Sequence, residues 1–211
     1  MEDFIYEKVK AGERIALEIV SGGNHYKGKV WNAIATQIYC ESGGGEFRDI
    51  GHLESGAPFL YGENERISIS HTDGCLVVAS VQIPEDLPVG QFDHATCLGV
   101  DVERVDREKV LRLRERFLTP EEQTLVPADS LEANIMAWTA KEAMLKASLT
   151  PGINWHTNLL IKRMPALADS PGAMDLDNPG KGLIILPDGE YPVDLFSLRY
   201  EDFIITVAAT R

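Results

Sequence analysis

Residues 98–103 read Leu-Gly-Val-Asp-Val-Glu, and this stretch decides how the chain is expected to fold. Its apolar residues occupy every second position, and therefore share one face of a β-strand. The other face then carries Gly99, Asp101 and Glu103. We predict a strand over Cys97–Glu103 with one buried face and one face that bears two carboxylates beside a glycine.

Further strands are predicted on both sides of this segment, where short runs are rich in β-branched and aromatic residues. They cover Phe4–Val9, Ile15–Val20, Ile67–His71, Cys75–Val81, Leu183–Leu186, Val193–Arg199 and Phe203–Ala209. Turn signals at residues 72–74 (Thr-Asp-Gly) and 187–189 (Pro-Asp-Gly) favour hairpins between neighbouring strands. The strands are therefore expected to pair largely in the antiparallel sense.

Two helices are predicted from apolar residues that recur at helical spacing. Lys27–Cys40 carries an apolar stripe of Val30, Ile34 and Ile38. Arg107–Leu118 has apolar residues at positions i, i+3, i+7 and i+8, which make one buried face.

Capping signals place two more helices after this point. Thr119 begins a capping box with proline at the first helical position, and Ser130 is an N-cap for a helix to about Leu149. The stretch Ala166–Gly182 is rich in Pro, Gly, Asp and Asn and is expected to be a long surface loop.

The length of the chain limits the number of domains. A chain of 211 residues has room for one domain or two small halves. Pro84 and Pro88 mark a connector near residues 84–95. We therefore expect an N-terminal half, residues 1–92, and a C-terminal half, residues 93–211, in an α+β fold with largely antiparallel sheets.

The composition excludes several classes of function. The chain has 20 Lys and Arg against 33 Asp and Glu, a net charge of −13, whereas a nucleic-acid backbone requires a positive field. It has no apolar run of about 18 residues, and its acidic start lacks a signal-peptide pattern. Cys40, Cys75 and Cys97 lack the spacing of a disulfide framework or a zinc site. We expect a cytoplasmic protein that binds neither nucleic acid nor membrane.

Asp101 and Glu103 are candidate metal ligands. Carboxylates about 5 Å apart repel each other by about 3 kcal/mol at an effective dielectric constant of ~20. A hard divalent cation offsets that repulsion. The ordinary alternative is an exposed strand whose acidic groups are solvated.

A second candidate group lies in residues 138–146, Trp-Thr-Ala-Lys-Glu-Ala-Met-Leu-Lys. Trp138, Glu142 and Lys146 are four residues apart and therefore stack along one helix face. Glu142 can bind metal or accept a proton, and Lys146 can neutralise phosphate charge. The alternative is a Glu–Lys pair that only stabilises the helix.

Ser70 and His71 form the third candidate group. They end a predicted strand beside the turn at residues 72–74, where a histidine can reach an anionic ligand. An ordinary turn histidine is the alternative.

The order of these three groups resembles the 4′-phosphopantetheinyl transferase superfamily, in its Sfp-type branch. The motifs are Ile-Ser-His at 69–71, Gly-Val-Asp-Val-Glu at 99–103 and the segment 138–146. Arg-Phe-Leu-Thr at 116–119, followed by an acid, and Gly-Ala-Pro at 56–58 resemble two further elements of that family. The resemblance is good over roughly residues 50–150 and looser at both ends.

This resemblance implies a fold and an activity. It implies two similar α+β halves related by a pseudo-twofold axis, with coenzyme A bound between them. It also implies Mg²⁺-dependent transfer of the 4′-phosphopantetheine arm of coenzyme A to a serine of an apo carrier protein (a holo-carrier-protein synthase), with release of 3′,5′-ADP.

The resemblance also implies a role for each candidate residue. Asp101, Glu103 and Glu142 are expected to hold Mg²⁺ on the pyrophosphate of coenzyme A. Glu142 is also the expected base for the carrier serine, and Lys146 is expected to contact the phosphate under attack. Asp101, Glu142 and Lys146 are thus the expected catalytic set.

Three more residues are expected near coenzyme A by the same resemblance. Ser70 and His71 are expected against the pyrophosphate. Lys141 is expected either to pair with the ligand's phosphates or to brace its own helix.

Basic residues gather in the segment that follows the acidic strand. Six fall within residues 104–116, against three acidic ones: Arg104, Arg107, Lys109, Arg112, Arg114 and Arg116. Such a local excess steers acidic partners, and the family's carrier proteins are acidic. We therefore expect the carrier to dock here, on a monomer, with a solvated helix face as the alternative.

Two departures from the family pattern keep other functions open. Ala57 stands where the family has a lysine, and few basic residues lie between residues 15 and 65. An inactive homologue that serves as a binding or regulatory module is therefore an alternative. A metal-dependent nuclease-like site is a third hypothesis, which the net charge of −13 opposes.

Overall fold

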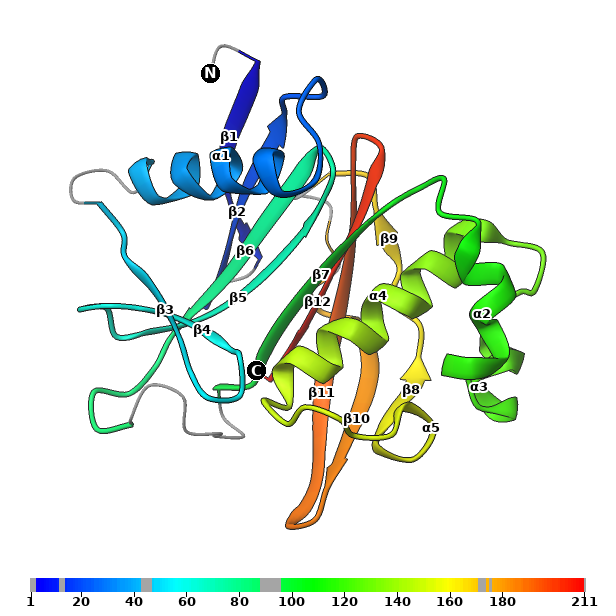
Figure 1. Ribbon diagram of the computed structural model, residues 1–211. Coiled ribbons are helices and arrows are strands. Elements are labelled where there is room, and N and C mark those ends of the chain that lie inside the picture. The colour runs from blue at the N-terminus through cyan, green and yellow to red at the C-terminus, as the bar shows by residue number, and fades with distance from the viewer. Residues whose placement is uncertain are drawn as a thin grey trace.

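Two antiparallel sheets, one from each part of the chain, build the fold (Figure 1). The computed structural model describes residues 3–11, 14–42, 47–87, 96–170, 174 and 176–210. Within these ranges each sheet has six strands.

The first sheet has the strand order β1-β2-β6-β5-β4-β3, and every neighbouring pair is antiparallel. Its helix, α1, follows the second strand. The elements in chain order are β1 (Phe4–Ala11), β2 (Ile15–Gly22), α1 (Gly28–Glu41), β3 (Ile50–His52), β4 (Pro58–Leu60), β5 (Glu65–Thr72) and β6 (Cys75–Gln82).

The second sheet has the order β7-β12-β11-β10-β8 with antiparallel pairs, while the two-residue β9 pairs with β11 in parallel. Four helices lie between its first two strands in the chain. The elements are β7 (Leu98–Arg104), α2 (Lys109–Phe117), α3 (Pro120–Leu125), α4 (Leu131–Ala147), α5 (Trp155–Asn158), β8 (Leu159–Arg163), β9 (Leu167–Ala168), β10 (Gly180–Leu186), β11 (Gly189–Tyr200) and β12 (Phe203–Ala209).

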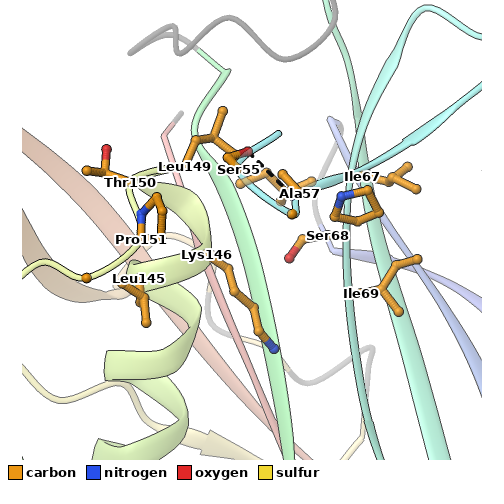
Figure 2. A pocket seen from close by; sticks show the side chains of 14 residues that line it. Ser55, Ala57, Ile67, Ser68, Ile69, Leu145, Lys146, Leu149, Thr150 and Pro151 are labelled. Atoms are coloured by element: carbon orange, nitrogen blue, oxygen red, sulfur yellow. Dashed lines mark hydrogen bonds between the residues drawn. The ribbon is translucent and has the colours of Figure 1, made fainter. Parts of the chain in front are cut away.

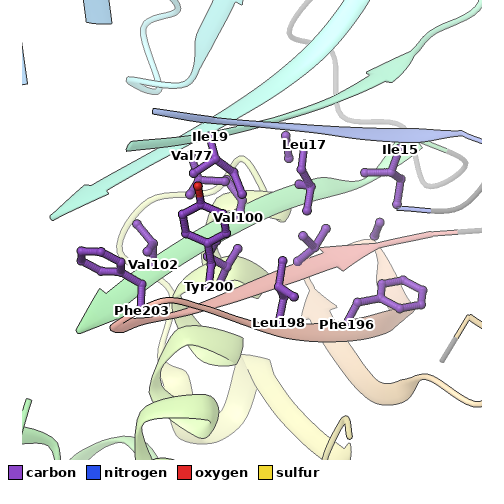
Figure 3. Packing of buried hydrophobic residues seen from close by; sticks show 14 of the residues in the cluster. Ile15, Leu17, Ile19, Val77, Val100, Val102, Phe196, Leu198, Tyr200 and Phe203 are labelled. Carbon is purple, nitrogen blue, oxygen red and sulfur yellow. The ribbon is translucent and has the colours of Figure 1, made fainter. Parts of the chain in front are cut away.

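The two sheets pack face to face through a shared apolar core (Figure 3). Leu17 and Ile19 of β2 lie on one side of it, and Val100 and Val102 of β7 on the other. Burial of such side chains stabilises the fold by roughly 1.5–3 kcal/mol each. The core therefore fixes β7, the strand with the two carboxylates, against the first sheet.

One long helix covers the outer face of each sheet. α1 packs on the first sheet and α4 on the second. Each half is thus an antiparallel sheet with one long helix outside it, which confirms the predicted α+β class with two similar halves. The predicted division between residues 92 and 93 lies outside the described residues and stays a prediction.

Each predicted strand and helix is observed, and the structure adds β3, β4, α5 and β8, which were not predicted. Two of the predictions differ from the structure in detail. In α1 the buried side chains are those of Trp31, Ala35, Tyr39 and Cys40. Of the predicted stripe, Val30 is 58% exposed while Ile34 and Ile38 are half-buried, so the buried face is rotated from the predicted one. The larger aromatic surface decides the face, and the indole nitrogen of Trp31 also donates to the carbonyl of Gly22, 2.8 Å away.

The second difference concerns the predicted loop Ala166–Gly182. β9 lies inside it, and β10 already begins at Gly180. Gly180 and Gly182 hide the start of this strand because glycine carries no β-forming side chain. The pairing of β10 with β8 also shifts register between Lys181 and Gly182, at this glycine-rich start of the strand.

Predicted capping signals fix the helices around the acidic strand. Thr119 and Glu122 form the capping box of α3, and the side chain of Ser130 accepts from the N–H of Ala133 at the start of α4. No helix among the described residues is long and apolar enough to cross a bilayer.

Candidate active site

Gly99 allows helix α4 to approach the polar face of β7. A Cβ atom at this position would lie 1.9 Å from the carbonyl oxygen of Ala143 and 2.7 Å from the nitrogen of Ala147. Only glycine fits so close to a helix backbone. The predicted space beside the two carboxylates is therefore filled by α4, which brings its own polar side chains to Asp101.

Two serine hydroxyls of β5 form hydrogen bonds with the backbone at the free edge of β7. Ser70 donates from Oγ to Asp101 Oδ1 at 2.7 Å and accepts from the N–H of Val102 at 3.4 Å. Ser68 accepts from the N–H of Val100 at 3.0 Å. Because β7 is the outermost strand of its sheet, these amides have no strand partner on that side. The serines therefore join the two halves at Asp101.

Lys146 reaches the same carboxylate from α4. Its Nζ lies 2.9 Å from Asp101 Oδ1 and 2.9 Å from the carbonyl oxygen of Val100. Asp101 is 6% exposed. An ammonium and a hydroxyl thus hold one oxygen of a buried carboxylate, as the charge requires.

The other oxygen of Asp101 lacks a hydrogen-bond partner among the described residues. Oδ2 is buried and accepts no bond from any residue that the structure describes. A buried carboxylate oxygen left in this state is costly unless a ligand satisfies it. Mg²⁺ satisfies this requirement, because it takes one or two carboxylate oxygens and completes its shell with phosphate oxygens and water.

Glu103 lies two residues further along the same face and is 7% exposed. Its carboxylate forms an ion pair with Arg107, whose guanidinium carbon lies 6.0 Å from the centre of the Trp138 ring. Burial raises the pKa of Glu103 to about 6, and the negative charge of Asp101 adds to the rise, while Arg107 and Trp138 oppose it.

Glu142 is the third carboxylate and is half-buried on α4. Burial raises its pKa, and the charge of Asp101 raises it further, whereas Lys146 and Arg107 lower it. The charge of Asp101 therefore acts on both Glu103 and Glu142. A carboxyl with a raised pKa is suited to accept a proton near neutral pH.

The three carboxylates are not gathered around a common point. Among the described residues no group of three His, Cys, Asp or Glu side chains is placed to hold a metal ion. Glu103 instead forms an ion pair with Arg107, and Asp101 forms one with Lys146. The donor chemistry fits Mg²⁺, with Asp101 Oδ2 as the free ligand, while Glu103 is held by a cation of the protein.

A cleft of about 300 Å³ opens between the halves beside this group (Figure 2). One wall comes from the segment 55–58 and from β5, and the other from the end of α4 and residues 149–152. Of the described residues that line it, only Lys146 carries a charged side chain, which extends toward β7. Lys146 therefore connects the cleft to Asp101, which does not itself line it.

No hydrogen bond or ion pair among the described residues links His71 or Lys141 to Asp101, although the charges of Lys146 and Asp101 act on His71. His71 is exposed and follows Ser70 on β5, so its side chain leaves the opposite face of the strand. Loss of hydration and the positive charge of Lys146 lower the pKa of His71.

Lys141 braces the protein interior. It is 0% exposed, and its Nζ lies 2.6 Å from Glu122 Oε1 and 3.2 Å from the carbonyl oxygen of Trp155. Of the two roles that the sequence left open, a phosphate contact or a brace for its helix, these contacts agree with the brace. A contact of Lys141 with a ligand's phosphates would require the buried pair to open.

Sequence reasoning missed two residues of the site. Arg107 was counted only as part of a basic surface, although its spacing of four from Glu103 suits an ion pair. Ser68 was not singled out, although strand alternation places it on the same face as Ser70.

Part of the chain matches a known protein family. A family model described as the 4'-phosphopantetheinyl transferase superfamily matches residues 97–207, which are 111 of the 211 residues. The match begins one residue before β7 and ends within β12, and so includes Asp101, Glu103, Glu142 and Lys146. Among curated proteins no match was found.

Proposed function

Because the chain belongs to the 4′-phosphopantetheinyl transferase superfamily and is therefore a transferase, we propose that it moves the 4′-phosphopantetheine arm of coenzyme A to a serine of an acidic carrier protein. The bond that forms joins the serine oxygen to phosphorus. The bond that breaks lies in the pyrophosphate, and 3′,5′-ADP leaves. The two similar halves in a single chain support an Sfp-type enzyme that acts as a monomer. A cytoplasmic location is part of the same proposal.

One observation carries this proposal. Asp101 lies where both halves meet, bonded to Ser70 of the first and to Lys146 of the second, and Lys146 also lines the cleft between them. Phosphoryl-type transfer depends on in-line positioning and charge neutralisation. A ligand in the cleft would place its phosphates against the ammonium of Lys146, which would stabilise the charge that builds up on them.

Glu142 is the proposed base. Its half-buried carboxyl has a raised pKa and stands one helical turn before Lys146 on α4. It therefore accepts the proton of the carrier serine near neutral pH, directly or through water. No cysteine is needed as a nucleophile, and all three cysteines are buried.

Asp101, Glu103 and Glu142 are the residues that would hold Mg²⁺. When bound, the ion would neutralise charge on the pyrophosphate. The free Oδ2 of Asp101 supports this assignment from the side of the protein. Glu103 would first have to leave Arg107.

The carrier is proposed to dock on one face of α2. Lys109, Arg112 and Arg116 are exposed and lie three and four residues apart, so they share a helix face. Arg114 belongs to the interior instead, since it donates to Asn134 and to the carbonyl of Val126. The docking face is therefore smaller than the six basic residues of the sequence suggested.

A transfer assay tests the proposed function. The full-length chain is incubated with coenzyme A, Mg²⁺ and an apo carrier domain, and the carrier is weighed by mass spectrometry. We expect the carrier to gain one phosphopantetheine group, with 3′,5′-ADP released in equal amount. Coenzyme A binding without transfer to any of several carrier classes would contradict the proposal and favour an inactive binding module.

A further inference from the structure

Arg107 stands between the proposed metal site and solvent. Its guanidinium pairs with Glu103 and lies over the ring of Trp138. The side chain of Arg107 is 37% exposed, whereas that of Glu103 is 9% exposed. An arginine that is partly in water can leave its partner without unfolding the site, unlike the fully buried Lys141, which pairs with Glu122.

A second cation acts in the same way on the neighbouring ligand. Lys146 bonds Asp101 Oδ1, and its side chain is 30% exposed. With Asp101, Glu103 and Glu142 ionised, three carboxylates and these two cations leave the group with one net negative charge. A divalent ion alone meets weak attraction there, because the protein's own cations already satisfy two of its ligands.

We propose that Arg107 makes metal binding depend on coenzyme A, by holding Glu103 until the pyrophosphate arrives. This inference rests on the proposed function and assigns Arg107 as a positioning residue that acts through Glu103. The negative pyrophosphate restores the attraction for a divalent ion and offers Lys146 another partner. Metal and coenzyme A therefore bind cooperatively, and each strengthens the other by the same factor.

Metal binding to the Arg107→Gln variant tests the inference without relying on activity. Mn²⁺ binding to the full-length chain is followed by electron paramagnetic resonance or calorimetry, with and without coenzyme A. Wild type is expected to bind Mn²⁺ much more tightly with coenzyme A than without it. The variant is expected to bind Mn²⁺ alone about tenfold more tightly than wild type, because changes to residues that contact metal ligands typically alter metal affinity by at least that factor. Coenzyme A is then expected to increase the Mn²⁺ affinity of the variant less than that of wild type.

Two further variants separate charge from packing. Arg107→Lys keeps a cation beside Glu103 and is expected to bind Mn²⁺ alone about as weakly as wild type. Arg104→Gln is the matched control, since Arg104 pairs with Asp106 and Asp202 rather than Glu103, and is expected to leave Mn²⁺ affinity unchanged. If Arg107→Gln does not fold, Arg107→Met retains the stem over Trp138 and takes its place.

The outcomes distinguish this inference from the proposed function. Unchanged or weaker binding of Mn²⁺ alone by the Arg107 variant, with wild type still binding Mn²⁺ in the presence of coenzyme A, overturns the role of Arg107 only. Failure of wild type to bind Mn²⁺ even with coenzyme A overturns both the metal site of the proposed function and this inference.

Discussion

The ammonium nitrogen of Lys146 lies 2.9 Å from Oδ1 of Asp101, a contact that joins helix α4 to strand β7. The same oxygen accepts the hydroxyl of Ser70 from the other half of the chain. Three elements that are distant in sequence therefore meet at one carboxylate. Lys146 also lines the cleft between the halves, which makes this contact the centre of the proposed chemistry.

Replacement of Lys146 tests its role in transfer. Lys146→Met removes the ammonium but keeps most of the apolar stem, and we expect the turnover number to fall by about 10²–10³, as for a lost donor to a transition state. Steady-state rates with a carrier protein measure the effect, and thermal melting shows whether the variant is folded. A folded variant with near-normal turnover would remove Lys146 from the mechanism.

Lys141 is expected to matter for stability rather than for the ligand. Lys141→Met leaves the carboxylate of Glu122 buried without its cation, which costs about 3–5 kcal/mol. Urea unfolding measures this loss. Coenzyme A affinity per folded molecule should stay unchanged, and a large loss of affinity would instead support a phosphate contact.

Glu103 gives the stability a defined dependence on pH. Its pKa is about 6 in the folded protein, above the ordinary value of 4.5, so the folded state binds the proton more tightly. Relative to Glu103→Gln, wild type should therefore lose unfolding free energy as pH rises from 4.5 to 6, by about 2 kcal/mol in total. Urea titrations of both proteins across this range measure it, and parallel curves would contradict the burial argument.

Gly99 is expected to set the distance between α4 and β7. In Gly99→Ala the new methyl group meets the carbonyl of Ala143, so the helix must shift. Overpacking of this kind costs about 1–3 kcal/mol and would separate Lys146 from Asp101. Unfolding measurements and transfer rates should both decline. A variant with wild-type stability would show that the helix can yield without cost.

The exposed basic face of α2 predicts how the carrier binds. Arg112→Glu combined with Arg116→Glu should raise the Michaelis constant for the carrier several-fold and leave that for coenzyme A unchanged, since charge steering acts on the acidic partner. Lys10→Glu with Lys162→Glu makes the same change in net charge on β1 and β8 instead of on α2 and serves as control. Equal effects of both pairs would point to net charge instead of docking.

The alternation of residues 98–103 was enough to predict the strand, its buried face and its two carboxylates. Local capping patterns likewise located the capping box at Thr119 and the N-cap at Ser130. These features depend on neighbouring residues only. For that reason most of the predicted helices and strands were confirmed.

Features that depend on distant residues were harder to predict. The buried face of α1 depends on what Trp31 packs against, and the partner of Lys141 is set by Glu122, which comes from another helix. The spacing of Glu103 and Asp101 indicated a metal site, yet nothing local showed that Arg107 and Lys146 hold these carboxylates. Tertiary contacts decided each of these cases.

Asp101→Asn tests the central claim most directly, because the change removes one charge from the residue where both halves meet. Transfer of phosphopantetheine to an apo carrier is measured by mass spectrometry for wild type and variant under equal conditions. We predict that wild type loads the carrier and that the folded variant is slower by at least about a hundredfold. Equal rates for the two proteins would contradict the account.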